Sequence, residues 1–198
     1  KDMLIVLEGL DGAGKSTLAR MLCGLQKNGS GTVLWAGKPM SRRLRRKKAY
    51  MVMQDVGHQL FTDSVAAECA LGIKAPNKDE IDRTLEKVDL LAYKERHPLS
   101  LSGGQMQRLA VVVSDICGKE LLVFDEPTSG LDRKSMEEVG TLTRSLATQG
   151  KVILIITHDI EFMMRICTRI LFIRDGEIVE DLSGGQKEKI VRLLRGEE

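Results

Sequence analysis

The sequence lacks any apolar stretch long enough to cross a membrane, since none approaches the roughly 18 consecutive apolar residues that a spanning helix needs. It also lacks paired cysteines, because its four cysteines lie far apart with no Cys-x-x-Cys. Free thiols in a reducing cytosol are therefore expected, rather than a disulfide framework or a zinc site. Charge of one sign is not in excess, and a net charge of +2 gives no global attraction to nucleic acid.

No signal-peptide pattern precedes the first apolar run, which starts directly after Lys1 and Asp2. What is present is an ordinary globular composition, with 42% apolar and 29% charged residues. We therefore expect a single domain over residues 1–198, large enough to bury a core.

Short apolar runs alternate with segments of helical apolar spacing, and this alternation predicts an α/β fold. The runs at 3–7, 121–124 and 152–156 are apolar throughout, which is typical of parallel strands buried on both faces. Further strands are expected at 32–35, 50–53, 170–173 and 177–179. Helices are expected at 15–25, 65–71, 78–88, 105–113, 133–148 and 160–166. The sequence thus predicts a mostly parallel sheet flanked by helices, with a helical subdomain inserted at approximately 63–114.

Residues 9–16 match the complete phosphate-loop pattern Gly-x-x-x-x-Gly-Lys-Ser. Glycine has no Cβ, so backbone N–H groups can close around phosphate oxygens, and the following helix adds partial positive charge at its N-terminus. Lys15 is expected to reach the β- and γ-phosphates, and Ser16 to ligate Mg²⁺. The residues expected to bind nucleotide here are Gly9, Asp11, Gly12, Ala13, Gly14, Lys15, Ser16 and Thr17. This pattern predicts the P-loop NTPase fold.

Polar side chains suited to hydrolysis stand at the ends of three expected strands. Asp125 ends an apolar run, and its carboxylate is expected to hold Mg²⁺ through water. The neighbouring Glu126 is the candidate general base that polarises the attacking water. His158, within Thr-His-Asp, is expected to contact the γ-phosphate and that water. Gln54 is expected to be a further ligand of Mg²⁺ and water.

The segment Leu-Ser-Gly-Gly-Gln at 101–105 is expected to open a helix, whose N-terminus is a second anion-binding site. One chain binds one γ-phosphate, which its own phosphate loop already surrounds. Ser102, Gly103, Gly104 and Gln105 are therefore expected to bind the ATP of a partner in a head-to-tail pair. The same five residue types recur at 182–186, where we expect a polar turn after the last strand that opens a terminal helix.

These motifs occur in one order, and together they resemble the ATP-binding-cassette (ABC) ATPases of ABC transporters. The segments 53–65 and 96–105 look most like the ATPases of energy-coupling-factor vitamin and cobalt transporters. The resemblance implies ATP hydrolysis with Mg²⁺, coupled to transport at the cytoplasmic face of the cell membrane. It implies two partners, a second ABC ATPase subunit (the same chain or a related one) and a membrane-embedded transporter subunit that docks near Gln54. No nucleic acid is expected as a partner.

Asp11 stands where this family usually has Asn, and the loop around it looks like that of a thymidylate kinase. Such a kinase has no use for the 101–105 segment, so it is the weaker alternative. A non-transport ABC ATPase of DNA repair or translation stays open. An inactive binding module is also an alternative, although the intact Lys15, Asp125, Glu126 and His158 argue against it.

Domains of the family carry an aromatic A-loop ahead of the phosphate-loop strand, and in this sequence only Lys1 and Asp2 precede that strand. Without adenine stacking, we expect ATP affinity to fall roughly five- to 150-fold, unless Trp35 or Tyr50 takes over. The sheet expected to carry both aromatics should then expose an edge. Residues 42–48, six of them basic, are expected to form a solvated loop between two strands, and a patch that binds nucleic acid or lipid headgroups is the weaker alternative.

Overall fold

The computed structural model describes residues 3–9, 14–27 and 30–194. In this part of the chain the main sheet has six strands, in the order β4-β5-β6-β1-β7-β8. Their bounds are β1 Met3–Glu8, β4 Ala49–Val52, β5 Leu121–Asp125, β6 Val152–Ile156, β7 Arg169–Arg174 and β8 Glu177–Ser183. Strands β4, β5, β6, β1 and β7 run parallel, and β8 pairs antiparallel with β7. The expected mostly parallel α/β sheet is confirmed.

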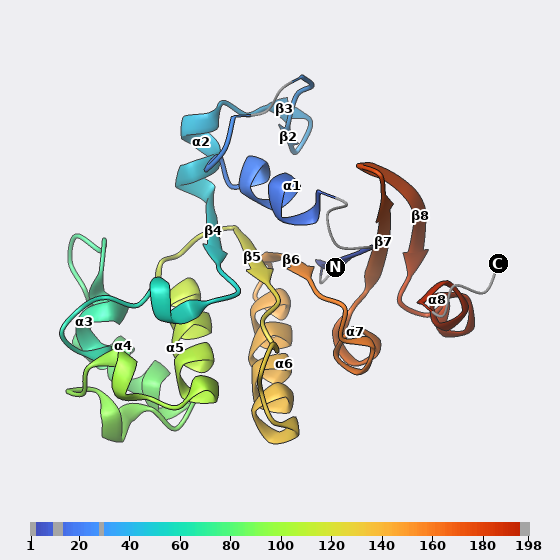
Figure 1. Cartoon of the computed structure of the whole chain (residues 1–198). Helices are drawn as coiled ribbons and strands as arrows, with labels where there is room; N and C mark the ends of the chain where they lie inside the picture. The colour runs from blue at the N-terminus through green and yellow to red at the C-terminus, as the bar shows by residue number, and fades with distance from the viewer. Residues whose placement is uncertain (1–2, 10–13, 28–29, 195–198) are drawn as a thin grey trace.

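Helices cover both faces of this sheet (Figure 1). Helix α1 (Lys15–Leu22) packs on one face, where Leu7 of β1 and Ala19 belong to one buried apolar cluster. The other face contributes Val6 of β1 to a second cluster. This second cluster is shared by α5 (Gly103–Ile116), α6 (Arg133–Thr148), α7 (Ile160–Ile166) and α8 (Lys187–Leu194). Successive residues of β1 thus bury on opposite sides, as its uninterrupted apolar run predicts.

A further apolar cluster lies among the helices inserted between β4 and β5. Helices α3 (Val65–Ala70) and α4 (Lys78–Glu86) contribute Val65 and Leu85 to it, and α5 contributes Leu109. Three short 3₁₀ helices complete the segment: η1 Val56–His58, η2 Leu91–Tyr93 and η3 Pro98–Ser100. All of these elements except η1 overlap the range of approximately 63–114, and that this range is a subdomain stays a prediction. No helix in the described residues is both long and apolar enough to cross a membrane.

The segment at 42–48 is a helix, so the expectation of a loop is wrong: α2 spans Arg42–Lys48. Ser41 caps it, since the Ser41 Oγ accepts a hydrogen bond of 3.3 Å from the Leu44 backbone N–H. Arginine, lysine and leucine are all good helix formers, and Arg45 is buried despite its charge. A run of like charge therefore does not prevent a helix when a cap and a buried side are available.

Trp35 and Tyr50 lie in different sheets, so the expectation that one sheet carries both is wrong. Trp35 belongs to β2 (Leu34–Trp35), which forms a separate antiparallel hairpin with β3 (Lys38–Pro39). Tyr50 lies in β4, which stands at the edge of the main sheet in the described part of the chain. Helix α2 lies between the hairpin and β4 in the chain.

The second Leu-Ser-Gly-Gly-Gln does not follow the last strand but supplies its end, because β8 runs on to Ser183. Strand β8 is longer than the expected 177–179, and a bidentate ion pair between Arg169 and Asp181 ties its distal part to β7. The residues after Ser183 form the expected turn, and α8 begins at Lys187.

Candidate functional site

One cavity of about 380 Å³ gathers side chains from most of the predicted site. It is lined by Gly14, Lys15, Ser16, Thr17, Gln54, Asp125, Glu126, Ile156 and His158. These residues come from the start of α1 and from the chain at or just after the ends of β4, β5 and β6. Because carboxyl ends of parallel strands meet at one edge of a sheet, the fold brings these distant segments together.

The described ends of the phosphate loop have backbone conformations that require glycine. A Cβ on Gly9 would lie 2.0 Å from the Ile173 carbonyl oxygen, and Gly14 has a φ of +87°. Lys15 is buried, and its Nζ donates a hydrogen bond of 2.5 Å to the Gly9 carbonyl oxygen. Its ammonium group is therefore folded back over the start of the loop. The predictions for Asp11, Gly12 and Ala13 fall outside the described residues.

Ser16 and Asp125 stand face to face in the cavity. The Ser16 hydroxyl donates to Asp125 Oδ1 at 3.4 Å, and Gln54 lines the same cavity. Burial raises the pKa of Asp125, and the hydrogen bond from Ser16 and the charge of Arg20 act in the opposite direction. A hydroxyl, a carboxylate and an amide oxygen are hard donors of the kind that Mg²⁺ takes. These three residues fit a magnesium site.

The Glu126 side chain lies against His158. The His158 Nδ1 lies 2.8 Å from Glu126 Oε1. Glu126 has a left-handed backbone conformation with a φ of +49°. Its backbone N–H donates a hydrogen bond of 2.8 Å to the Ile156 carbonyl oxygen, which helps to maintain this conformation. Burial raises the pKa of Glu126, whereas His158 and a hydrogen bond with Thr157 lower it. A carboxylate so placed lies within reach of a water molecule bound in the cavity and can act as its proton acceptor.

Two further residues at this edge were missed by the sequence analysis. Glu8 ends β1 directly before the phosphate loop and is only 8% exposed, and its Oε2 has no hydrogen-bond partner among the residues that the structure describes. Burial raises the pKa of Glu8, and the nearby Lys15 ammonium lowers it. Thr157 is fully buried, and its Oγ1 accepts a hydrogen bond of 3.1 Å from the Asp159 backbone N–H. An acidic residue that ends an apolar strand was the available signal for Glu8.

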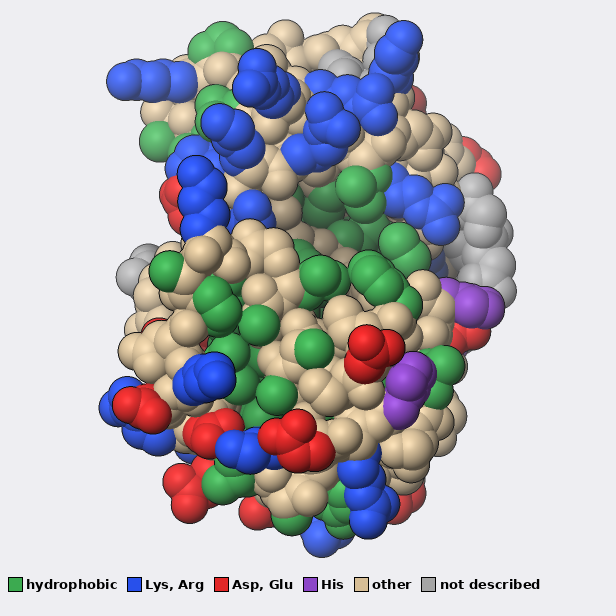
Figure 2. Space-filling model, turned by 90° about the vertical axis from the view of Figure 1, so that its left-hand side faces the viewer, with side chains coloured by type: hydrophobic (Ala, Val, Ile, Leu, Met, Phe, Trp, Pro, Cys, Tyr) green, Lys and Arg blue, Asp and Glu red, His purple; other side chains and the backbone are tan. Residues whose placement is uncertain are grey.

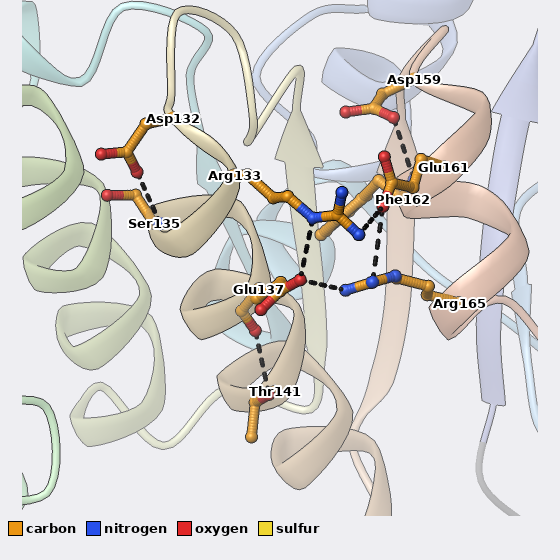
Figure 3. A network of polar contacts seen from close by, with 9 residues as sticks. All are labelled: Asp132, Arg133, Ser135, Glu137, Thr141, Asp159, Glu161, Phe162 and Arg165. Carbon is orange, nitrogen blue, oxygen red and sulfur yellow. Dashed lines mark hydrogen bonds and ion pairs between the residues drawn. The ribbon is translucent and has the colours of Figure 1, made fainter.

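Helices α6 and α7, which follow Glu126 and His158 in the chain, share a network of four ion pairs, two of which cross from one helix to the other (Figure 3). Arg133 and Arg165 each contact both Glu137 and Glu161, at distances of 2.9 to 3.4 Å. Asp132 caps α6 and Asp159 caps α7 through backbone N–H groups, as Figure 3 also shows. Exposed pairs of this kind stabilise by about 0–1 kcal/mol each, so the network aligns the helices only modestly.

The 101–105 segment does not line the cavity. Its Ser102 Oγ accepts from the Gln105 N–H at 3.3 Å, and Gln105 Oε1 accepts from the Ser102 N–H at 2.9 Å, a complete capping box. Ser102 and Gly103 are exposed, so the N-terminus of α5 is open to an outside ligand.

The two aromatics considered for adenine stacking are also outside the cavity. The Tyr50 Oη accepts a hydrogen bond of 3.1 Å from Gln59 Nε2. The Lys48 ammonium covers Trp35, with its Nζ 5.3 Å from the centre of the Trp35 ring.

The phosphate loop at a strand-to-helix junction, with a lysine, two carboxylates and a histidine around one cavity, defines a P-loop ATPase. The sequence agrees: residues 1–129 match the family model described as ABC transporter. The chain belongs to the ABC transporter family, whose ATP-binding domains bind and hydrolyse ATP.

Relatives support the same family. A putative ABC transporter ATP-binding protein of Treponema denticola is 56% identical over 191 residues, which cover 96% of this chain. A second protein with this description, from Streptomyces avermitilis, is 36% identical, with 92% of this chain and 72% of that protein covered. The chain spans only 39% and 36% of the length of two Treponema denticola relatives.

Solved structures show the fold. The cbiO1 protein of Clostridium perfringens, described as part of the ABC transporter complex cbiONQ, superimposes with a TM-score of 0.84 at 28% identity. The match covers 99% of this chain and 83% of cbiO1. A bacterial Atm1-family ABC exporter with ATP bound matches at 24% identity with a TM-score of 0.83, over 98% of this chain and 36% of the exporter. The exporter likeness shows the fold alone.

Proposed function

We propose that the chain is the ATP-hydrolysing, nucleotide-binding part of an ABC importer of the energy-coupling-factor type. The observation that carries this proposal is the single cavity in which Lys15, Ser16, Gln54, Asp125, Glu126 and His158 meet. The likeness to cbiO1, a part of a transporter complex, supports the importer type.

In this proposal the phosphate loop and the Lys15 ammonium bind the phosphates of ATP. Lys15 exchanges its present bond with the Gly9 carbonyl for phosphate oxygens. Ser16, Asp125 and Gln54 hold Mg²⁺, which when bound neutralises charge on the phosphates. The experiment is ATP titration with Lys15→Ala: each charge-assisted contact is worth about 1.5–3 kcal/mol, so affinity should fall at least tenfold.

Glu126 is the proposed general base, and His158 orients it and the attacking water. The Glu126 side chain is 11% exposed, and its carboxylate already lies against the His158 imidazole. This contact keeps the proton acceptor at a fixed place. Because bulk water has little access to the Glu126 carboxylate, this carboxylate is free to accept a proton from the attacking water bound in the cavity. Lys15 stabilises the charge that develops on the γ-phosphate.

Hydrolysis is proposed to require a second ATPase subunit, bound head to tail. Gly103 is the informative position, because a Cβ there meets nothing within 4 Å in the described part of the single chain. Gly103→Ala should therefore leave the monomer folded but disturb a nucleotide held by a partner, and Ser102→Arg should do so more strongly. Sedimentation with ATP in the Glu126→Gln background measures the dimer; an undiminished dimer in both variants would contradict this arrangement.

The membrane partner is proposed to dock beside Gln54, at the cytoplasmic face of the membrane. Large apolar side chains are exposed there: Phe61 is 69% exposed, Leu99 54% and Met53 43%. Met53 and Phe61 lie on the chain around this loop, and Leu99 approaches it, since its Cδ2 would lie 3.8 Å from a Cβ on Gly57. Single surface leucines are common, but such a group of three favours a protein contact. Affinity capture with the native full-length protein should recover a multi-span membrane protein, and Phe61→Asp should weaken its recovery. Recovery of ribosomes or DNA instead would support a non-transport ABC ATPase.

A further inference from the structure

Charge is strongly segregated along this nearly neutral chain. Residues 12–54 contain ten lysines and arginines and no aspartate or glutamate. The rest of the chain holds the remaining 20 basic and all 28 acidic residues, a net charge of −8. The small net charge of +2 therefore hides one strongly basic part, which consists of α1, the β2–β3 hairpin and α2.

The basic part gathers on one side of the molecule. Figure 2 shows lysine and arginine side chains crowded over its upper end, where α2 and the hairpin lie, with few acidic side chains among them. Lys38, Arg43, Arg46 and Lys47 are all exposed, and we call these four residues the basic face. No ion pair within the described residues involves any of the four.

Other cations of α2 have structural partners, which separates them from the basic face. Arg42 donates to the carbonyl oxygens of Gly24 and Leu25, both at 2.8 Å. Lys48 pairs with Glu120 and covers the Trp35 ring. These contacts fix α2 against its neighbours, and the basic face therefore projects from a supported helix rather than from a free tail.

Exposed apolar side chains lie among these cations. Leu44, within α2, is 39% exposed, and Leu34, on the hairpin, is 57% exposed. Cations mixed with exposed aliphatic groups suit the boundary between lipid headgroups and acyl chains. Single-stranded nucleic acid instead requires aromatic rings on which bases stack, and the nearby Trp35 ring is covered by Lys48.

We propose that the basic face binds the anionic headgroups of a phospholipid membrane. Attraction of juxtamembrane cations to anionic lipid supplies the affinity, and Leu34 and Leu44 add shallow apolar contact. The choice of lipid as the anionic ligand rests on the proposed function, in which the protein works at a membrane. A basic face turned to the headgroups would hold the ATPase at the membrane independently of its transporter subunit.

The test is flotation of the nucleotide-free protein with vesicles, without any transporter subunit. Vesicles of phosphatidylcholine mixed with phosphatidylglycerol should bind it, and vesicles of phosphatidylcholine alone should not. Each cation near an anionic surface raises binding about fivefold, so Arg43→Gln/Arg46→Gln/Lys47→Gln should weaken binding roughly 100-fold. Glutamine is a good helix former, so α2 should persist in this variant.

The matched control is Lys74→Gln/Lys78→Gln/Lys87→Gln, which removes the same charge from exposed positions of the helical insertion. It should change vesicle binding only a few-fold. Equal binding to neutral vesicles, or equal loss in the two triple variants, would overturn the proposal. Tighter binding of a duplex oligonucleotide than of anionic vesicles at the same salt would also overturn it, in favour of nucleic acid. ATP hydrolysis plays no part in this measurement, so a negative result leaves the proposed ATPase function standing.

Discussion

The Thr128 hydroxyl donates a hydrogen bond of 3.3 Å to Asp159 Oδ2, across 31 residues of sequence. Thr128 lies two residues after Glu126, and Asp159 directly follows His158. The other carboxylate oxygen of Asp159 accepts from the Phe162 N–H at 2.9 Å and caps α7. One aspartate thus ties the chain after the proposed base to the helix after the histidine. This bond helps to hold Glu126 and His158 at 2.8 Å from each other.

Replacing Thr128 by valine should lower kcat and leave ATP affinity unchanged. Valine keeps the size of this buried side chain but cannot donate to Asp159. A hydrogen bond to a charged group is worth about 1.5–3 kcal/mol. Because this bond is as long as 3.3 Å, we expect the lower end of that range, which corresponds to about a tenfold loss of kcat. Steady-state kinetics with ATP titration measures both quantities. Thr128→Ser keeps the hydroxyl and should restore most of the rate; equal losses in the two variants would show a packing effect only.

Replacing Glu126 by glutamine should slow ATP hydrolysis by about 10²–10⁴-fold, the usual contribution of a general base. Nucleotide binding should persist, because the phosphate loop and Lys15 are untouched. Single-turnover hydrolysis and ATP titration are the measurements. Asp132→Asn, which alters a carboxylate at the cap of α6 outside the cavity, is the control. Hydrolysis by Glu126→Gln at the unmodified rate would remove Glu126 from the base role.

Replacing Glu8 by methionine should stabilise the nucleotide-free protein near neutral pH. Burial raises the pKa of Glu8 above its ordinary 4.5, so the folded state holds the proton more tightly than the unfolded state. Stability from this difference is present below pH 4.5 and is lost as the pH rises through the folded-state pKa. At neutral pH an unpartnered buried carboxylate oxygen remains, which costs about 1–3 kcal/mol.

Urea unfolding of Glu8→Met at pH 4.5 and pH 8 tests the direction in which stability from Glu8 changes with pH. The gain over the unmodified protein should be larger at pH 8 than at pH 4.5. Glu8→Gln is the matched variant, because it removes the charge and keeps a polar amide in the same place; its gain should be smaller. A loss of stability in both variants at pH 8 would mean that the ionised carboxylate is favourably paired with Lys15.

Replacing Gly104 by alanine should destabilise the single chain, and replacing Gly103 should not. A Cβ on Gly104 would lie 2.4 Å from the Ser135 Oγ and 2.9 Å from its Cβ, whereas one on Gly103 meets no described residue within 4 Å. The hydroxyl can rotate away but the Ser135 Cβ cannot, so overpacking of about 1–3 kcal/mol is expected. Thermal unfolding of both variants measures it. In Gly104→Ala/Ser135→Gly the two losses should be less than additive; strict additivity would show that these groups do not collide.

Elements with strong local signals were predicted well from the sequence. The bounds of β6 and of α6 and α7 agree with the predicted ranges. Each has a continuous apolar run or a clear helical period, so local pattern and tertiary packing favour the same structure. Helix α1 ends at Leu22, earlier than expected, because the chain turns at Gly24 with a φ of +72°.

Elements with weak local signals required the structure. The helix at Arg42–Lys48 depends on the cap by Ser41 and on the burial of Arg45, neither of which a run of basic residues reveals. The separation of Trp35 from the main sheet depends on which strands find partners, a long-range choice.

By itself the sequence determined the α/β alternation, the phosphate loop and the strand ends at which Gln54, Asp125 and His158 stand. It could do so because buried parallel strands and glycine-dependent loops leave local patterns, and because carboxyl ends of such strands share one edge. Only the tertiary structure decided that Glu8 is buried, that Thr128 meets Asp159 and that the cations of α2 form an exposed face. These features depend on side chains far apart in the chain, whose distances are set by packing and not by the residues beside them.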